Sequence, residues 1–229
     1  MRRELENSLY KLAREEDVIL LLGDLGSFPT FQERYPDKVI NVGCMESNMV
    51  NFAVGLASEG YKVVIYTVSG FTLYKAYDQI KFIVPEIKNA GGSITIFNAG
   101  PGFVYNAVGR GHYLFSDLAL IEQEANVFMP KCKLEVREAL DSIKDEGSFN
   151  YIRGGADGAP LRTHNMGFDY SIGTVVTTGT TFDRVLEIVL ENDIRCDVES
   201  LYNSLPDGKE NLTVIEDHQQ NGGVNTILN

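Results

Sequence analysis

The sequence predicts an α/β protein in which a domain built around a mostly parallel sheet is followed by a second, smaller α/β unit. Two observations lead to this prediction. Short apolar runs alternate with segments of helical period between residues 2 and 152, which is the order that places helices against a parallel sheet. The alternation stops at 154–167, a glycine-rich stretch, and resumes over a remainder that is short for a complete domain.

Spacing and composition predict the elements of the first domain. Leucines three and four residues apart indicate the first helix, wholly apolar or β-branched runs indicate buried strands, and Pro85 is expected to end the helix before it. In chain order we expect helix 2–14, strands 18–22 and 39–42, helix 46–58, strand 62–67, helix 71–84, strand 93–97, a helix capped by Ser116 and running to Leu120, strand 127–129, helix 134–143 and strand 149–152.

The second unit is expected to follow a linker. We place the first domain at 1–155, the linker at 156–170 and the second unit at 171–229. In the second unit the same patterns predict strand 174–177, helix 181–190, and strands 195–198 and 212–215.

Charge and cysteine content exclude several classes of partner and site. Acidic residues outnumber basic ones 32 to 20, and no run of Lys or Arg offers a contact surface for nucleic acid or anionic lipid. No apolar stretch reaches the roughly 20 residues that cross a bilayer. The three cysteines are far apart and odd in number, which favours a reducing cytoplasm. The three histidines are equally dispersed, so we predict no metal ligand in this chain.

One carboxylate occupies an unusual position. Glu46 begins the helix 46–58, which is apolar on nearly every side and is therefore expected to be buried. A glutamate in the first turn of a helix complements the helix dipole, and taken alone this explains it. If the start of the helix faces the interior or a partner, however, the carboxylate needs a bonding partner there.

Several segments together resemble the pyrimidine-binding domain of transketolases and of 1-deoxyxylulose-5-phosphate synthases. They cover most of the chain in the order of that family. The matching segments are Gly23–Ser27, Asn41–Gly60, Phe71–Gln79, Gly111–Leu120, Tyr151–Arg153 and Ile215–His218. The resemblance implies a subunit of a thiamine-diphosphate-dependent enzyme that transfers a two-carbon ketol unit from a ketose-like donor to an aldehyde.

The resemblance also implies roles for individual residues. Glu46 matches the carboxylate that hydrogen-bonds the aminopyrimidine ring and so promotes loss of the thiazolium C2 proton. His112 matches a histidine that donates a proton to the substrate oxygen. Phe71 matches a residue that stacks on the pyrimidine ring, and Tyr74 follows one helical turn later, although ordinary packing also explains it. Asp24 matches an acidic residue near the cofactor, or is simply a turn-forming residue.

Substrate contacts are expected from other positions. Arg153 matches an arginine that binds the phosphate of sugar phosphates, and the alternative for it is an interdomain ion pair. Ser27 and Arg110 are further candidates. The chain departs from the family at Val108, where an aspartate contacts the donor, and at Gly100, where a histidine binds phosphate, so the usual ketose donor is in doubt.

The motif by which the family holds Mg²⁺ and the cofactor diphosphate, Gly-Asp-Gly…Asn, does not occur here. The resemblance therefore implies a partner chain, a diphosphate-binding subunit like the N-terminal part of transketolase, arranged around a homodimer core as a pair of heterodimers. The substrate would be a small sugar or sugar phosphate. The alternatives are a carboligase, the β-like subunit of a 2-oxo acid decarboxylase or dehydrogenase, or a non-catalytic scaffold.

Overall fold

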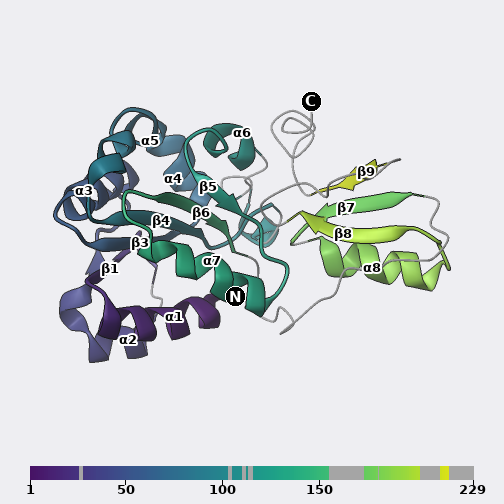
Figure 1. The fold of residues 1–229 in the computed structure, drawn as a ribbon, viewed down its shortest axis with the longest axis horizontal. Helices are drawn as coiled ribbons and strands as arrows, with labels where there is room; N and C mark the ends of the chain where they lie inside the picture. The colour runs from purple at the N-terminus through teal and green to yellow at the C-terminus, as the bar shows by residue number, and fades with distance from the viewer. Residues whose placement is uncertain are drawn as a thin grey trace.

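The computed structural model describes residues 1–25, 28–102, 105–109, 112, 116–154, 173–179, 181–201 and 212–216. Within these residues the chain forms a six-stranded sheet and a three-stranded sheet, both parallel (Figure 1). This confirms the predicted fold class. The proposed linker, 156–170, lies outside the described residues, and the domain limits on either side of it stay a prediction.

The first sheet has the strand order β2-β1-β3-β4-β6-β5. Its strands are β1 (Val18–Leu22), β2 (Val39–Asn41), β3 (Lys62–Thr67), β4 (Ser93–Asn98), β5 (Asn126–Phe128) and β6 (Phe149–Arg153). Every residue of β1, β3, β4 and β6 is buried, as expected for strands covered by helices on both faces. The chain order reverses between β1 and β3, and in such sheets ligands bind at the carboxyl ends of the strands beside the reversal.

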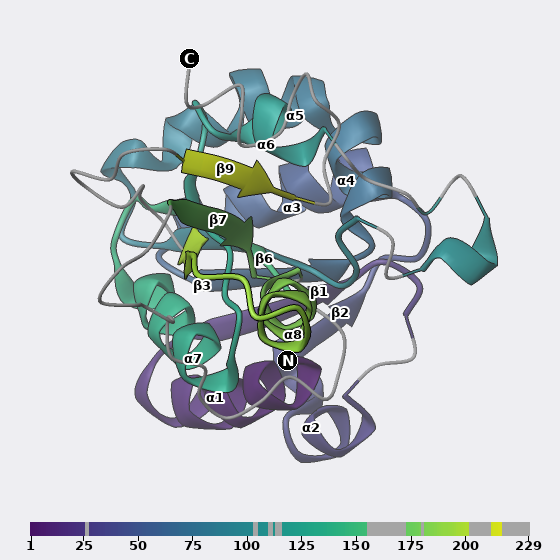
Figure 2. The ribbon, with the colours of Figure 1, turned by 90° about the vertical axis from the view of Figure 1, so that its right-hand side faces the viewer.

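Helices cover both faces of this sheet (Figure 2). One layer, with its own apolar core, contains α1 (Arg2–Glu15), α2 (Pro29–Arg34) and α7 (Lys133–Asp141). The other contains α3 (Glu46–Ser58), α4 (Ser69–Lys75), α5 (Tyr77–Phe82) and α6 (Asp117–Ile121). Short 3-10 turns are η1 (Pro36–Lys38), η2 (Val84–Asn89), η3 (Asn106–Val108) and η5 (Ser142–Lys144). Among the described residues, no helix is long and apolar enough to span a membrane.

Three predicted details are wrong. The expected helix 71–84 is two short helices that break at Ala76, whose backbone is not helical, and Pro85 lies inside η2 rather than ending a helix. Ser116 stands at the N-cap of α6, but its hydroxyl makes no cap hydrogen bond and lies 2.7 Å from the hydroxyl of Tyr74. Helix α3 has the predicted limits, yet it buries only one face and leaves Phe52 exposed.

The second unit contains β7 (Thr174–Thr178), α8 (Phe182–Glu191), β8 (Asp197–Leu201) and β9 (Leu212–Ile215), with the strand order β8-β7-β9. The strand predicted at 195–198 begins two residues later. Leu118 and Met129 of the first unit share an apolar cluster with Val176 and Leu201 of the second. A side chain at Gly179 would overlap the carbonyl of Pro130, so the two units are in close contact.

Candidate active site at the carboxyl edge of the sheet

The predicted site residues follow the carboxyl ends of the strands in the first sheet. They are Asp24 after β1, Glu46 at the start of α3 after β2, Phe71 in α4 after β3, His112 in the loop after β4, and Arg153 as the last residue of β6. Carboxyl ends of parallel strands share one edge, so the topology gathers residues that are distant in sequence. Ser27 and Arg110 lie outside the described residues.

Glu46 is a buried carboxylate with a cation beside it. Its side chain is 7% exposed, and Lys75 Nζ donates hydrogen bonds to both of its oxygens at 3.1 Å. Ser47 Oγ donates to the carbonyl of Lys75, which ties the start of α3 to the end of α4. The Lys75 side chain is 52% exposed, so its ammonium can reach water, but the buried Glu46 carboxylate then needs another hydrogen-bond donor in its place.

Phe71 and His112 continue this group of contacts. Lys75 Nζ lies 4.9 Å from the centre of the Phe71 ring. The Phe71 and His112 rings are 5.1 Å apart and meet edge to face at 78°. The structure therefore brings Glu46, Phe71 and His112 together through Lys75, which the sequence reasoning did not single out. The sequence feature that could have pointed to Lys75 is its position four residues after Phe71, which puts both side chains on the same face of the helix.

This arrangement suits an aminopyrimidine ring. A single ammonium contacts both the Glu46 carboxylate and the Phe71 ring, so these two groups face one space. With Lys75 moved aside, a ring stacked on Phe71 would share a proton between one of its ring nitrogens and the Glu46 carboxylate. Among the described residues, no three His, Cys, Asp or Glu lie close enough together to hold a metal ion.

Asp24 and Tyr74 lie at the margin of this group. Asp24 is exposed and has a left-handed backbone, with φ of 55°, and its N–H donates to Asn41 Oδ1 at 3.2 Å. Its carboxylate is 3.6 Å from the Cys44 thiol and raises the pKa of that thiol. The Tyr74 ring is 57% exposed, and its hydroxyl meets Ser116. The contact of either residue with a cofactor stays a prediction.

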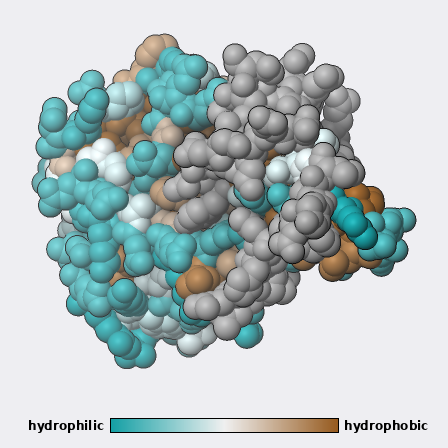
Figure 3. Space-filling model, turned by 45° about the vertical axis from the view of Figure 1, so that its right-hand side comes forward, coloured by the Kyte–Doolittle hydropathy of each residue, from teal (hydrophilic) through white to brown (hydrophobic). Residues whose placement is uncertain are grey.

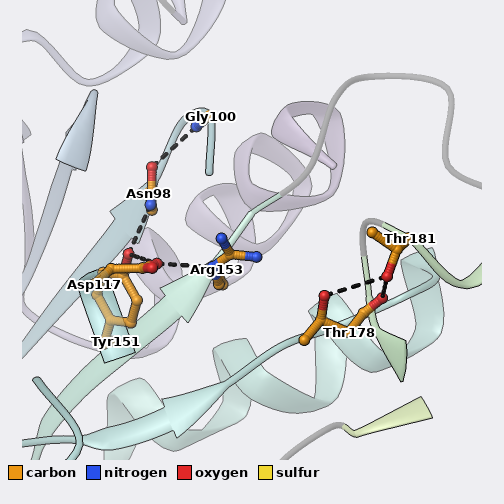
Figure 4. Close-up of polar contacts among 7 residues, drawn as sticks. All are labelled: Asn98, Gly100, Asp117, Tyr151, Arg153, Thr178 and Thr181. Atoms are coloured by element: carbon orange, nitrogen blue, oxygen red, sulfur yellow. Dashed lines mark hydrogen bonds and ion pairs between the residues drawn. The ribbon is translucent and has the colours of Figure 1, made fainter. Parts of the chain in front are cut away.

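Arg153 is buried and belongs to a polar network (Figure 4). Its Nε donates to Asp117 Oδ2 at 2.7 Å, and the Tyr151 hydroxyl donates to the same oxygen at 2.8 Å. Burial, reinforced by the charge of Asp117, raises the pKa of Tyr151 well above its ordinary value, so the phenol stays protonated. The guanidinium is thus in an ion pair, and its predicted contact with a substrate phosphate stays a prediction.

Two residues of the loop after β4 lack a polar side chain. A side chain at Gly100 would overlap the ring of Tyr105, so Tyr105 takes the space beside Gly100. Val108 is 61% exposed. Neither Gly100 nor Val108 has a side chain that can form a hydrogen bond, and their match to a histidine and an aspartate of the family stays a prediction.

An apolar groove follows the outer face of α3. It has a volume of about 640 Å³ and is lined by Val42, Met45, Asn48, Asn51, Phe52, Gly55, Leu56 and Glu59. Phe52 is 53% exposed within it. Figure 3 shows hydrophobic side chains, in brown, on the second unit at the right-hand end. In that unit Ile188 and Leu190 of α8 are exposed.

Comparisons with known proteins agree on one kind of relative. The chain is 26% identical over 226 residues to a subunit of the apulose-4-phosphate transketolase of Actinobacillus succinogenes, covering 86% of this chain and 71% of that protein. It is 31% identical over 164 residues to the 1-deoxy-D-xylulose-5-phosphate synthase of Exiguobacterium sibiricum, covering 68% of this chain but only 25% of the synthase. No protein-family model matches the chain.

A solved structure shares the whole fold. It is described as a split-gene transketolase in an inactive beta4 tetramer, and it superimposes with a TM-score of 0.73 at 21% identity. The match covers 98% of this chain and 82% of that one. Both units of the present chain, and not only the larger sheet, are therefore arranged as in that structure.

Proposed function

The chain belongs to the transketolase family, and from that premise we propose that it is the C-terminal subunit of a two-chain, thiamine-diphosphate-dependent transketolase-like enzyme. The observation that carries the proposal is the series of contacts that links Glu46, Lys75, Phe71 and His112 at the carboxyl edge of the sheet. In this reading the chain supplies the pyrimidine half of each active site. The diphosphate and Mg²⁺ are held mainly by a second subunit.

The residues of this chain bind and orient the cofactor. Thiamine diphosphate supplies the electron sink for cleaving and forming a carbon–carbon bond. Glu46 holds a proton at the pyrimidine ring, after Lys75 has released the carboxylate, and Phe71 presents its face to that ring. We assign to His112, which is in edge-to-face contact with Phe71, the role of giving a proton to the substrate oxygen.

The substrate is proposed to be a ketose-like donor that ordinary transketolases use poorly. Tyr105 packs against Gly100, and Val108 is apolar, so two polar contacts to a phosphorylated ketose are lost. A site that lacks these polar side chains no longer favours the substrate that they would bind. We also propose that Arg153 contacts an anionic group of the substrate. That group would compete with the Asp117 carboxylate for the Arg153 guanidinium.

Co-expression with a second chain that carries the Gly-Asp-Gly…Asn motif tests this function. We expect the assembled complex to transfer two-carbon units from a ketose to an aldehyde, with D-xylulose 5-phosphate among the poorer donors, and each chain alone to be inactive. Rapid turnover of D-xylulose 5-phosphate would contradict the proposed donor preference. Release of CO₂ from a 2-oxo acid, without ketol transfer, would instead indicate the carboligase or 2-oxo acid enzyme.

The groove on α3 is proposed to lie in the homodimer core. Phe52→Glu should raise the dissociation constant of the self-associated chain at least tenfold, because burying a phenylalanine stabilises by roughly 1.5–3 kcal/mol and about 1.4 kcal/mol corresponds to a factor of ten. Sedimentation equilibrium measures this dissociation constant. Phe82→Glu is the matched control, since Phe82 is also exposed but lies on α5, outside the groove. Equal effects of both variants would contradict the assignment.

A further inference from the structure

We propose that Tyr151 is a positioning residue, which together with Asn98 and Asp117 holds the loop carrying His112 through a buried chain of hydrogen bonds. The loop leaves β4 at Asn98 and ends where α6 begins at Asp117. Both ends of it are bonded to one side chain of β6, Tyr151. The catalytic role of His112 rests on the proposed function. The hydrogen bonds that hold its loop are present whether or not that function is correct.

The hydrogen bonds run in one direction. The backbone N–H of Gly100 can only donate, and it meets Asn98 Oδ1 at 3.0 Å. This orients the Asn98 amide, so that its Nδ2 donates to the Tyr151 oxygen at 2.6 Å. The Tyr151 hydroxyl must then give its proton to Asp117 Oδ2, at 2.8 Å. Figure 4 shows these groups in line from the start of the loop to the carboxylate.

Arg153 completes the network by supplying charge. Its Nε donates to the same Asp117 oxygen, which therefore accepts from two donors on β6. Asn98, Asp117 and Tyr151 are fully buried, and Arg153 is nearly so. At low dielectric such bonds are strong when satisfied and costly when broken. Apolar side chains of similar volume would serve packing alone equally well, so the polar set is best explained by the geometry that it imposes.

A second contact fixes the same end of the loop from the other side. Ser116 precedes Asp117, and its hydroxyl lies 2.7 Å from that of Tyr74 on α4. Phe71, one turn earlier on α4, is the ring against which His112 packs. The end of the loop and the ring that receives its histidine are thus both tied to the same short helix, α4.

The spectrum of His112 in the isolated chain tests the inference without any catalysis. The chain has three histidines, so His112→Gln identifies the ring signals of His112 in a sample labelled at histidine. We expect the ring current of Phe71 to displace the chemical shifts of the His112 ring protons. The Phe71→Leu variant, which has no aromatic ring at this position, shows the shifts after complete loss of that displacement. Tyr151→Phe, which removes one hydroxyl and thereby two links of the chain, should abolish at least half of the displacement.

Matched variants separate positioning from general loosening of the fold. Tyr10→Phe also removes a phenol hydroxyl, but on α1 at the opposite face of the sheet, and should leave the His112 signals in place. If Tyr151→Phe does not fold, Asn98→Ser cuts the same chain at the link to Gly100 and should have the same effect. Unchanged His112 signals in a folded Tyr151→Phe or Asn98→Ser protein would overturn the proposal. An inactive complex with normal His112 signals would count against the proposed function alone.

Discussion

Replacing Glu46 with glutamine is expected to slow exchange of the thiazolium C2 proton in the assembled complex by about 10²–10⁴-fold, the range typical of general acid–base catalysis. The amide keeps the shape of the side chain and can still accept and donate hydrogen bonds. It cannot hold a shared proton at the pyrimidine ring as the carboxylate does. The exchange rate is measured by quenching in D₂O and proton NMR of the cofactor.

Glu138→Gln is the matched control for this variant. Glu138 is exposed on α7, outside the groove on α3, so the same chemical change should leave the exchange rate within a factor of about three of the wild type. A Glu46→Gln complex that exchanges the proton as fast as the Glu138→Gln complex would contradict the catalytic role. It would favour the simpler role of a glutamate that complements the dipole of α3.

Asp117→Asn is expected to lower the free energy of unfolding of the chain by about 3–5 kcal/mol, the usual effect of removing one partner from a buried ion pair. Asparagine fits the space and keeps an oxygen, but it removes the negative charge that the buried Arg153 guanidinium meets at 2.7 Å. Both side chains are at most 1% exposed, so water cannot replace the carboxylate. Urea denaturation followed by circular dichroism measures the change.

An exposed pair in the second unit provides the comparison. Arg184 and Glu187 are also an arginine and a carboxylate, at 3.0 Å, but their side chains are 69% and 61% exposed. Glu187→Gln should therefore change the unfolding free energy by less than about 1 kcal/mol. Similar losses in Asp117→Asn and Glu187→Gln would show that the buried network does not stabilise the fold as its burial indicates.

Local patterns predicted the strands and long helices well. The limits of β1, β3 and α3 agree with the apolar runs and periods that predicted them, because a segment buried on both faces, or along one stripe, must carry that pattern. The break at Ala76 was missed, since neither side of it has a glycine or proline. It follows instead from the packing of two short helices on α3, which a single segment does not reveal.

Some residues of the candidate site could be predicted from the sequence, and others could not. Glu46, Phe71 and His112 each lie in a segment that matches the family, so their convergence follows once the topology is known. Lys75 and Tyr151 acquire their partners only through the packing of α4 on α3 and the register that pairs Asn98 with Arg153 across β4 and β6. Such contacts join residues that are far apart in the chain, so the local spacing of residues in the sequence does not predict them.

Titration of the chain with thiamine diphosphate and Mg²⁺ in a calorimeter tests the central claim, that the cofactor site is divided between two subunits. The chain offers a carboxylate and aromatic rings for the pyrimidine but no Gly-Asp-Gly…Asn motif for the diphosphate. We expect no measurable binding to the chain alone, and binding together with activity once the diphosphate-binding subunit is added. Micromolar binding of the cofactor to this chain by itself would contradict the account.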